Sequence, residues 1–162
     1  MGNRRHLSRQ LALQILYAKE YLAADPGAIA QRLAESGLVG AKNWSAFARD
    51  LVMKTLENRD DLDAAITEAL ENWRIERLSV VDRQILRLAL CEMRYFADLP
   101  LRVTLDEYIE LAKEFGTDDS AAFVNGVLDR LAKVHANKDF RQETTAHPAR
   151  KSHKPKPTTE EA

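Results

Sequence analysis

The sequence predicts an all-α fold of about seven helices, because its apolar residues recur at steps of three and four positions. This spacing places the apolar side chains of each segment on one face of a helix. Runs of alternating β-branched residues, which would indicate strands, are missing from the sequence. Capping residues, glycines and prolines stand between the periodic segments and divide them into helices of ordinary length.

The helices of the first half of the chain are separated by clear capping signals. The first helix is expected at about residues 5–23, with Leu and Ile side chains on its buried face. Asp25 and Pro26 provide an N-cap and a first-turn proline for a short second helix. A third helix is expected at about residues 45–58, and Asp60 is expected to cap the fourth.

The second half contains the most apolar helix, at residues 85–96, which we expect at the centre of the core. Ser79 is expected to cap its start. Thr104 opens a capping box for the next helix, which ends at Gly116, and Thr117 is expected to cap the last helix. The side chains expected to be largely buried in these helices are Leu86, Leu88, Leu90, Met93, Ile109 and Leu128.

The composition limits the classes of protein to which this chain can belong. We expect one helical domain at residues 1–136 and a disordered charged tail at 137–162, where the periodicity ends and prolines accumulate. The formal net charge of −1 argues against a protein that coats nucleic acid through its overall charge, so any affinity must come from a local basic patch. The single cysteine, Cys91, and the lack of long apolar segments predict a cytoplasmic protein without a membrane span.

The first candidate site is a basic cluster at the N-terminus. It consists of Arg4, Arg5, His6 and Arg9, and no acidic residue precedes Glu20. A helix N-terminus disfavours cations, so this arrangement opposes local stability and favours a function such as gripping a phosphate backbone. A basic start that is merely solvated is the alternative.

The second candidate site lies at the start of the last helix. Asp119, Phe123 and Asn125 precede Gly126, and a glycine inside a helix costs about 1 kcal/mol relative to alanine. The glycine therefore predicts a close approach to the backbone by a packed helix or a ligand. Phe123 could stack on an unpaired base and Asn125 could bind a base edge, whereas a core position for Phe123 is the alternative.

Signals for catalysis are weak. Asp60, Asp61 and Asp63 resemble metal-binding acids, but we expect them to cap a helix instead. The sequence has no Gly-rich phosphate loop, nucleophile elbow or cysteine pair, so we expect neither an enzyme nor a cofactor or metal. Trp44 and Trp73 are expected to be core or inter-helix anchors.

Ordered motifs extend over nearly the whole expected domain, from about residue 4 to residue 135. They are Arg9-Gln-Leu-Ala-Leu-Gln-Ile-Leu-Tyr17, Glu71-Asn-Trp-Arg-Ile-Glu-Arg-Leu78, Asp82-Arg-Gln-Ile-Leu-Arg-Leu-Ala-Leu-Cys-Glu92, Glu110-Leu-Ala-Lys-Glu-Phe-Gly116 and Phe123-Val-Asn-Gly-Val-Leu-Asp129. In order and spacing, the chain resembles the bacterial transcription antitermination factors of the NusB family.

The resemblance implies two packed helical subdomains. It also implies binding of the single-stranded boxA element of ribosomal RNA leaders together with NusE, a small-subunit ribosomal protein, in an antitermination complex on RNA polymerase. Homodimers occur in such families, and the sequence leaves the oligomeric state open. By position, the implied RNA contacts are Arg4, Arg5, His6, Arg9, Arg87, Asp119, Phe123 and Asn125, and the implied partner contact is Asp82.

The chain departs from the family pattern in its charge. His6 and Leu7 dilute the N-terminal arginine run, and Ala121 and Ala122 stand where the family often has a basic pair. We therefore expect weak intrinsic RNA binding and a strong dependence on NusE, with the basic stretch at 150–156 as a possible phosphate tether. Two other functions stay open: a protein-binding adaptor without RNA binding, and an accessory module related to ribosomal RNA methyltransferases.

Overall fold

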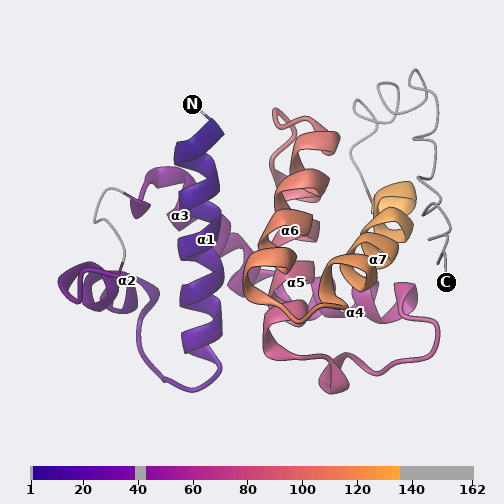
Figure 1. Cartoon of the computed structure of the whole chain (residues 1–162), viewed down its shortest axis with the longest axis horizontal. Helices are drawn as coiled ribbons and strands as arrows, with labels where there is room; N and C mark the ends of the chain where they lie inside the picture. Colours follow the sequence, from indigo (N-terminus) through magenta and orange to yellow (C-terminus); the bar gives the residue numbers. More distant parts are fainter. Residues whose placement is uncertain (1, 39–42, 136–162) are drawn as a thin grey trace, which may run out of the picture.

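Seven α-helices and one 3-10 helix make up the described part of the chain, residues 2–38 and 43–135 of this computed structural model (Figure 1). They are α1 (Gly2–Lys19), α2 (Pro26–Glu35), α3 (Ala46–Glu57), α4 (Arg59–Ala69), η2 (Ile75–Arg77), α5 (Val80–Tyr95), α6 (Leu101–Phe115) and α7 (Ser120–His135). None of these residues forms a strand, so the expected all-α fold is confirmed. The expected tail at 137–162 lies outside the described residues.

Helix α5 is the centre of the fold. It packs against α1 and α3 on one side and against α4, α6 and α7 on the other, so the helices form two groups around it (Figure 1). Because both sides are covered, every side chain from Gln84 to Met93 is buried. Leu86, Leu88 and Leu90 are fully enclosed, as the apolar pattern predicts.

The prediction for Ile109 is wrong, since its side chain is only half-buried. The buried face of α6 consists of Leu101, Thr104, Tyr108, Leu111 and Ala112. These positions recur at steps of three and four residues, and Ile109 lies at the edge of the stripe that they form. None of the helices in the described ranges is long and apolar enough to span a bilayer.

Two predicted helix caps are confirmed. The Asp25 carboxylate accepts hydrogen bonds from the backbone N–H groups of Gly27 and Ala28, at the start of α2. The hydroxyl of Ser79 accepts from the backbone N–H of Asp82 at 3.1 Å. Ser45, for which no cap was predicted, caps α3 in the same way. Each bond satisfies a backbone donor that a helix start leaves unpaired.

Three predicted caps are wrong, two of them at the starts of α6 and α4. Helix α6 begins at Leu101, with Pro100 at the N-cap, so Thr104 lies inside the helix, where its hydroxyl donates to Glu92. A buried carboxylate needs hydrogen-bond donors, and it takes this hydroxyl away from the capping role. Helix α4 begins at Arg59, so Asp60 belongs to its first turn and does not cap it.

The turn between α6 and α7 depends on a close approach at Gly116. A Cβ atom there would clash with Ser120 and lie 2.6 Å from the carbonyl oxygen of Ala112. The backbone φ of Gly116 is −91°, so its lack of a side chain matters here, rather than a left-handed conformation. Thr117 does not cap α7 as expected; instead its backbone N–H donates to the hydroxyl of Ser120 at 2.9 Å.

The two tryptophans differ. Trp44 is half-buried against the core, as expected. Trp73 lies in the segment between α4 and η2 and is 61% exposed, so the expectation that it anchors the core is wrong. Ile75, two residues later, is buried and holds this segment to the fold.

Candidate functional site

Arg4 and Arg5 form the exposed part of the basic cluster on the first turns of α1. Neither forms an ion pair within the described part of the chain. The guanidinium of Arg5 lies 5.5 Å from the centre of the Phe47 ring on α3, a distance typical of a cation–π contact. This contact orients Arg5 and leaves its donors open to an anionic ligand.

Arg9 is not part of this exposed cluster, which corrects the prediction that it contacts RNA. Its side chain is 1% exposed and forms a two-pronged ion pair with Glu92 of α5, with N···O distances of 2.6 and 3.0 Å. Thr104 and Tyr108 of α6 donate to the same carboxylate at 2.9 and 2.7 Å. Arg9 therefore joins α1, α5 and α6 inside the protein.

The sequence contained a signal for the burial of Arg9. Leu13 and Leu16, which lie four and seven residues after it, are both buried, and these steps share one helix face. A charge on that face needs an internal partner. The partner, Glu92, is 83 residues away in the sequence, so no local pattern identifies it.

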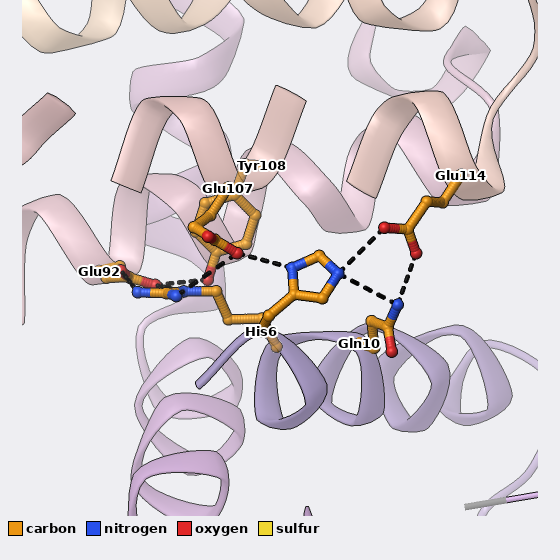
Figure 2. A network of polar contacts seen from close by, with 7 residues as sticks. His6, Gln10, Glu92, Glu107, Tyr108 and Glu114 are labelled. Atoms are coloured by element: carbon orange, nitrogen blue, oxygen red, sulfur yellow. Dashed lines mark hydrogen bonds and ion pairs between the residues drawn. The ribbon is translucent and has the colours of Figure 1, made fainter. Parts of the chain in front are cut away.

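His6 lies between two carboxylates of α6 (Figure 2). Its Nδ1 is 2.6 Å from Glu107, and its Nε2 is 3.0 Å from Glu114. The side-chain amide of Gln10, one turn further along α1, donates to Glu114 as well. His6 is thus engaged with acidic groups of the protein rather than extended toward solvent, in contrast to the predicted RNA contact.

Arg87 is also engaged within the protein, so the prediction that it contacts RNA is corrected as well. Its Nε and Nη2 donate to the two carboxylate oxygens of Asp63 on α4 at 2.7 and 2.8 Å. Its Nη1 donates to Glu20 at 3.3 Å, and the side chain is only 5% exposed. Asp63 therefore pairs with Arg87, and the described residues contain no cluster of acids, histidines and cysteines suited to a metal.

The second predicted group lies in the first turns of α7 and in the turn just before it. Asp119 and Asn125 are exposed, whereas Phe123 is half-buried against the core. A Cβ atom built on Gly126 would meet no atom within 4 Å outside the adjacent backbone of its own helix. No helix in the described part of the chain packs there, so packing within that part does not account for the glycine.

Asp82 lies at the start of α5 and is half-buried. Its Oδ1 and the Nε of the neighbouring Arg83 are both buried, and neither finds a hydrogen-bond partner among the described residues. Buried polar atoms are nearly always paired, so these two unpaired atoms are unusual.

Two tyrosines beside Asp82 and Arg83 were missed by sequence reasoning. Tyr17 and Tyr21 pack against each other at the end of α1, with ring centres 5.5 Å apart, and are 43% and 66% exposed. Glu20 lies between them in sequence and forms an ion pair with Arg83 at 3.5 Å, which connects this end of α1 to the start of α5. A tyrosine pair at a four-residue step on a helix, outside the apolar face, was the available signal.

Comparison with known proteins agrees with the fold. A family model described as the NusB family matches residues 6–133. The chain belongs to the NusB family.

Among NusB relatives, the transcription antitermination protein NusB of Geobacter sulfurreducens is 45% identical over 138 residues, covering 85% of this chain and 99% of the relative. The solved structure of T. maritima NusB has a TM-score of 0.75 and 37% identity, covering 85% of this chain and 96% of that one. A crystal structure of the antitermination factors NusB and NusE in complex with dsRNA has a TM-score of 0.70 and 25% identity. It covers 82% of this chain and 98% of that one.

Within this NusB fold, the predicted site residues fall into separate places. Arg4 and Arg5 are exposed on α1, while Phe123 and Asn125 lie on α7. Helix α6 lies between these two groups, because it packs against α7 and is joined to α1 through His6 (Figure 1). We call the exposed N-terminal arginines and residues 119–126, which form the turn before α7 and its first turns, the two flanking groups of α6.

Proposed function

We propose that this chain is a transcription antitermination factor that binds single-stranded boxA RNA of ribosomal RNA leaders jointly with NusE and acts on RNA polymerase. The observation that carries the proposal is the pair of flanking groups of α6. Arg4, Arg5 and Asn125 make no polar contact inside the described protein, and the surface at Gly126 is open. A ligand that uses all of them must be long and flexible and must carry both phosphates and exposed bases.

The chemistry of each flanking group fits a single strand. Arginines bind phosphates through several parallel donors, and they position a strand without reading its sequence. Single-stranded bases expose their faces and edges, so the half-buried ring of Phe123 offers a stacking surface and the amide of Asn125 a hydrogen-bonding group. The missing side chain at Gly126 permits a base or sugar to lie against the helix backbone.

The partner surface is proposed at the start of α5 and the end of α1. It consists of Asp82, Arg83, Tyr17 and Tyr21. Tyrosines and arginines are enriched among the residues that dominate binding energy at protein interfaces. A partner that donates to Asp82 Oδ1 and accepts from Arg83 Nε would satisfy the two buried atoms that the described chain leaves unpaired.

Dependence on the partner follows from the low charge of the RNA surface. Ala121 and Ala122 add no cations near Phe123, and Arg9 and Arg87 are paired internally. Stacking contributes about 1–3 kcal/mol per base, which is too little to hold a flexible strand tightly. The relative solved with NusE and RNA supports a joint complex.

The test is a titration of fluorescently labelled boxA-type RNA with the full chain, with and without NusE. We expect weak binding by the chain alone and a gain of about tenfold or more with NusE. Asp82→Lys should reduce this gain and leave the weak intrinsic binding in place. Tight binding without NusE, or a gain that Asp82→Lys does not change, would show that the proposed partner role is wrong. No RNA binding under either condition would favour the adaptor function.

A further inference from the structure

The contacts of His6 with α6 depend on whether its imidazole ring is protonated. Both ring nitrogens of His6 lie within 3.0 Å of carboxylate oxygens, one from Glu107 and one from Glu114 (Figure 2). A neutral imidazole has one N–H donor and one lone pair, whereas the imidazolium ion donates from both nitrogens. The two carboxylates therefore favour a protonated His6, since in the neutral form one of them would face a lone pair. The amide nitrogen of Gln10 also lies 3.3 Å from Nε2 and would donate to that lone pair, but the Glu114 carboxylate is closer, at 3.0 Å.

The groups around His6 are mostly acidic. Arg9 on the same helix also lies close to Glu107, with its Nη1 3.8 Å from that carboxylate, but it is already paired with Glu92. Gln10 contributes an uncharged amide to Glu114. On the exposed side of α6, Glu110 is paired with Lys113 at 3.0 Å, and behind the ring Tyr108 donates to Glu92. Within the described part of the chain, His6 is therefore the group that balances the charge of Glu114.

These acids lie on α6, between the two flanking groups that the proposed RNA strand must reach. A strand that runs from Arg4 and Arg5 to Asn125 has to pass α6, where unbalanced carboxylates would repel its phosphates. When His6 is protonated, its charge offsets one of them and its two hydrogen bonds fix the first turns of α1 on α6. When it is neutral, the charge and one of the two hydrogen bonds are lost.

We propose that His6 is a positioning residue for RNA rather than a direct contact: its bridge to Glu107 and Glu114 holds the N-terminal arginines in place and screens the acids of α6, so that RNA affinity depends on pH. This inference rests on the proposed RNA-binding function. It differs from the sequence prediction, in which His6 itself bound the phosphate backbone.

The electrostatics of the site support the geometry. Partial burial by itself would lower the pKa of His6, but the hydrogen bond and charge of Glu107, followed by those of Glu114, outweigh it and raise the pKa above the ordinary value of 6.5. A group with a raised pKa in the folded state contributes its full stability below the unfolded-state pKa. The contribution of His6 is therefore complete below pH 6.5 and is lost as the pH rises through the raised value.

The experiment measures binding of boxA-type RNA by the full chain from about pH 5.5 to about pH 8.5, the range in which histidines titrate. The variants are His6→Gln, which cannot be charged, and His6→Arg, which is always charged. We expect the affinity of the unmodified chain to fall about two- to fivefold across this range, the size of a half-exposed charge-pair effect. His6→Gln should be weak and His6→Arg strong throughout.

Two controls separate the possible failures. The histidines at 135, 147 and 153 and the α-amino group are retained in His6→Gln, so any pH dependence that persists in this variant belongs to groups other than His6. Glu114→Gln, at a half-exposed position, should lower the pKa of His6 in an NMR titration and shift the binding profile to lower pH. RNA binding with the same pH profile in His6→Gln as in the unmodified chain would overturn the inference and leave the proposed function intact. Absence of RNA binding at every pH would overturn both.

Discussion

Replacing Gly126 with alanine should stabilise the protein and weaken its binding to RNA. The added methyl group would enter open space, since no atom outside the adjacent helix backbone lies within 4 Å of its position. The φ angle of Gly126 is not positive, so alanine adopts the same backbone without strain. The gain should be about 1 kcal/mol from helix propensity alone, or about 3–5 °C in Tm for a domain of this size.

The loss of RNA affinity is expected because the same open space is proposed to accept a base or sugar. Forcing a methyl group into a close contact costs about 1–3 kcal/mol, so the Kd for boxA-type RNA in the presence of NusE should rise at least about fivefold. Chemical denaturation gives the free energy of unfolding, and fluorescence anisotropy gives the Kd. The combination of higher stability and lower affinity separates a ligand contact from damage to the fold.

A matched control is Ala64→Gly on α4, another exposed position inside a helix. It should destabilise the protein by about 1 kcal/mol and leave RNA binding unchanged. A Gly126→Ala variant that is stabilised and binds RNA as well as the unmodified chain would refute the proposal that this glycine faces the ligand. If Gly126→Ala lowered the free energy of unfolding, the added methyl group would not be entering open space, and the surface at Gly126 would not be open.

Further predictions concern the core and the basic cluster. Arg9→Ala should cost about 3–5 kcal/mol in the free energy of unfolding, because it leaves a buried carboxylate without its cation; a loss below 1 kcal/mol would contradict the internal role. Leu86→Ala should cost about 2–5 kcal/mol by the same denaturation assay, since its side chain is fully enclosed. Changing both Arg4 and Arg5 to alanine should weaken RNA binding and reduce the salt slope of log K by about 1.4, whereas Arg32→Ala on α2 should change neither.

The fold could be predicted from the sequence because it depends on local signals. Three- and four-residue spacing predicts the helices, and Asp25 and Ser79 cap them as expected. The prediction for Thr104 is wrong because a threonine three residues before a glutamate can have either of two roles. It can open a capping box, or its hydroxyl can donate to a buried acid. The acid in question, Glu92, lies on another helix.

The candidate site could be predicted only in part. A basic cluster in a sequence does not distinguish an exposed arginine from one with a distant internal partner, and Arg9 and Arg87 both have such partners. Charged residues that pair across helices leave no periodic signal. Gly126 is informative because a glycine inside a helix lowers the stability of the protein, which predicts that something else requires it there. The sequence leaves open whether that requirement is internal packing or a ligand.

The most direct test of the proposed RNA surface is an NMR titration of the isotopically labelled full chain with boxA-type RNA, followed through backbone amide shifts. Shifts should concentrate in the first turns of α1 around Arg4 and Arg5 and in α7 from Phe123 to Gly126, on both sides of α6. Amides next to Arg87 on α5 should move little. Shifts confined to α4 and α5, or to one flanking group of α6 alone, would contradict an RNA path that crosses α6.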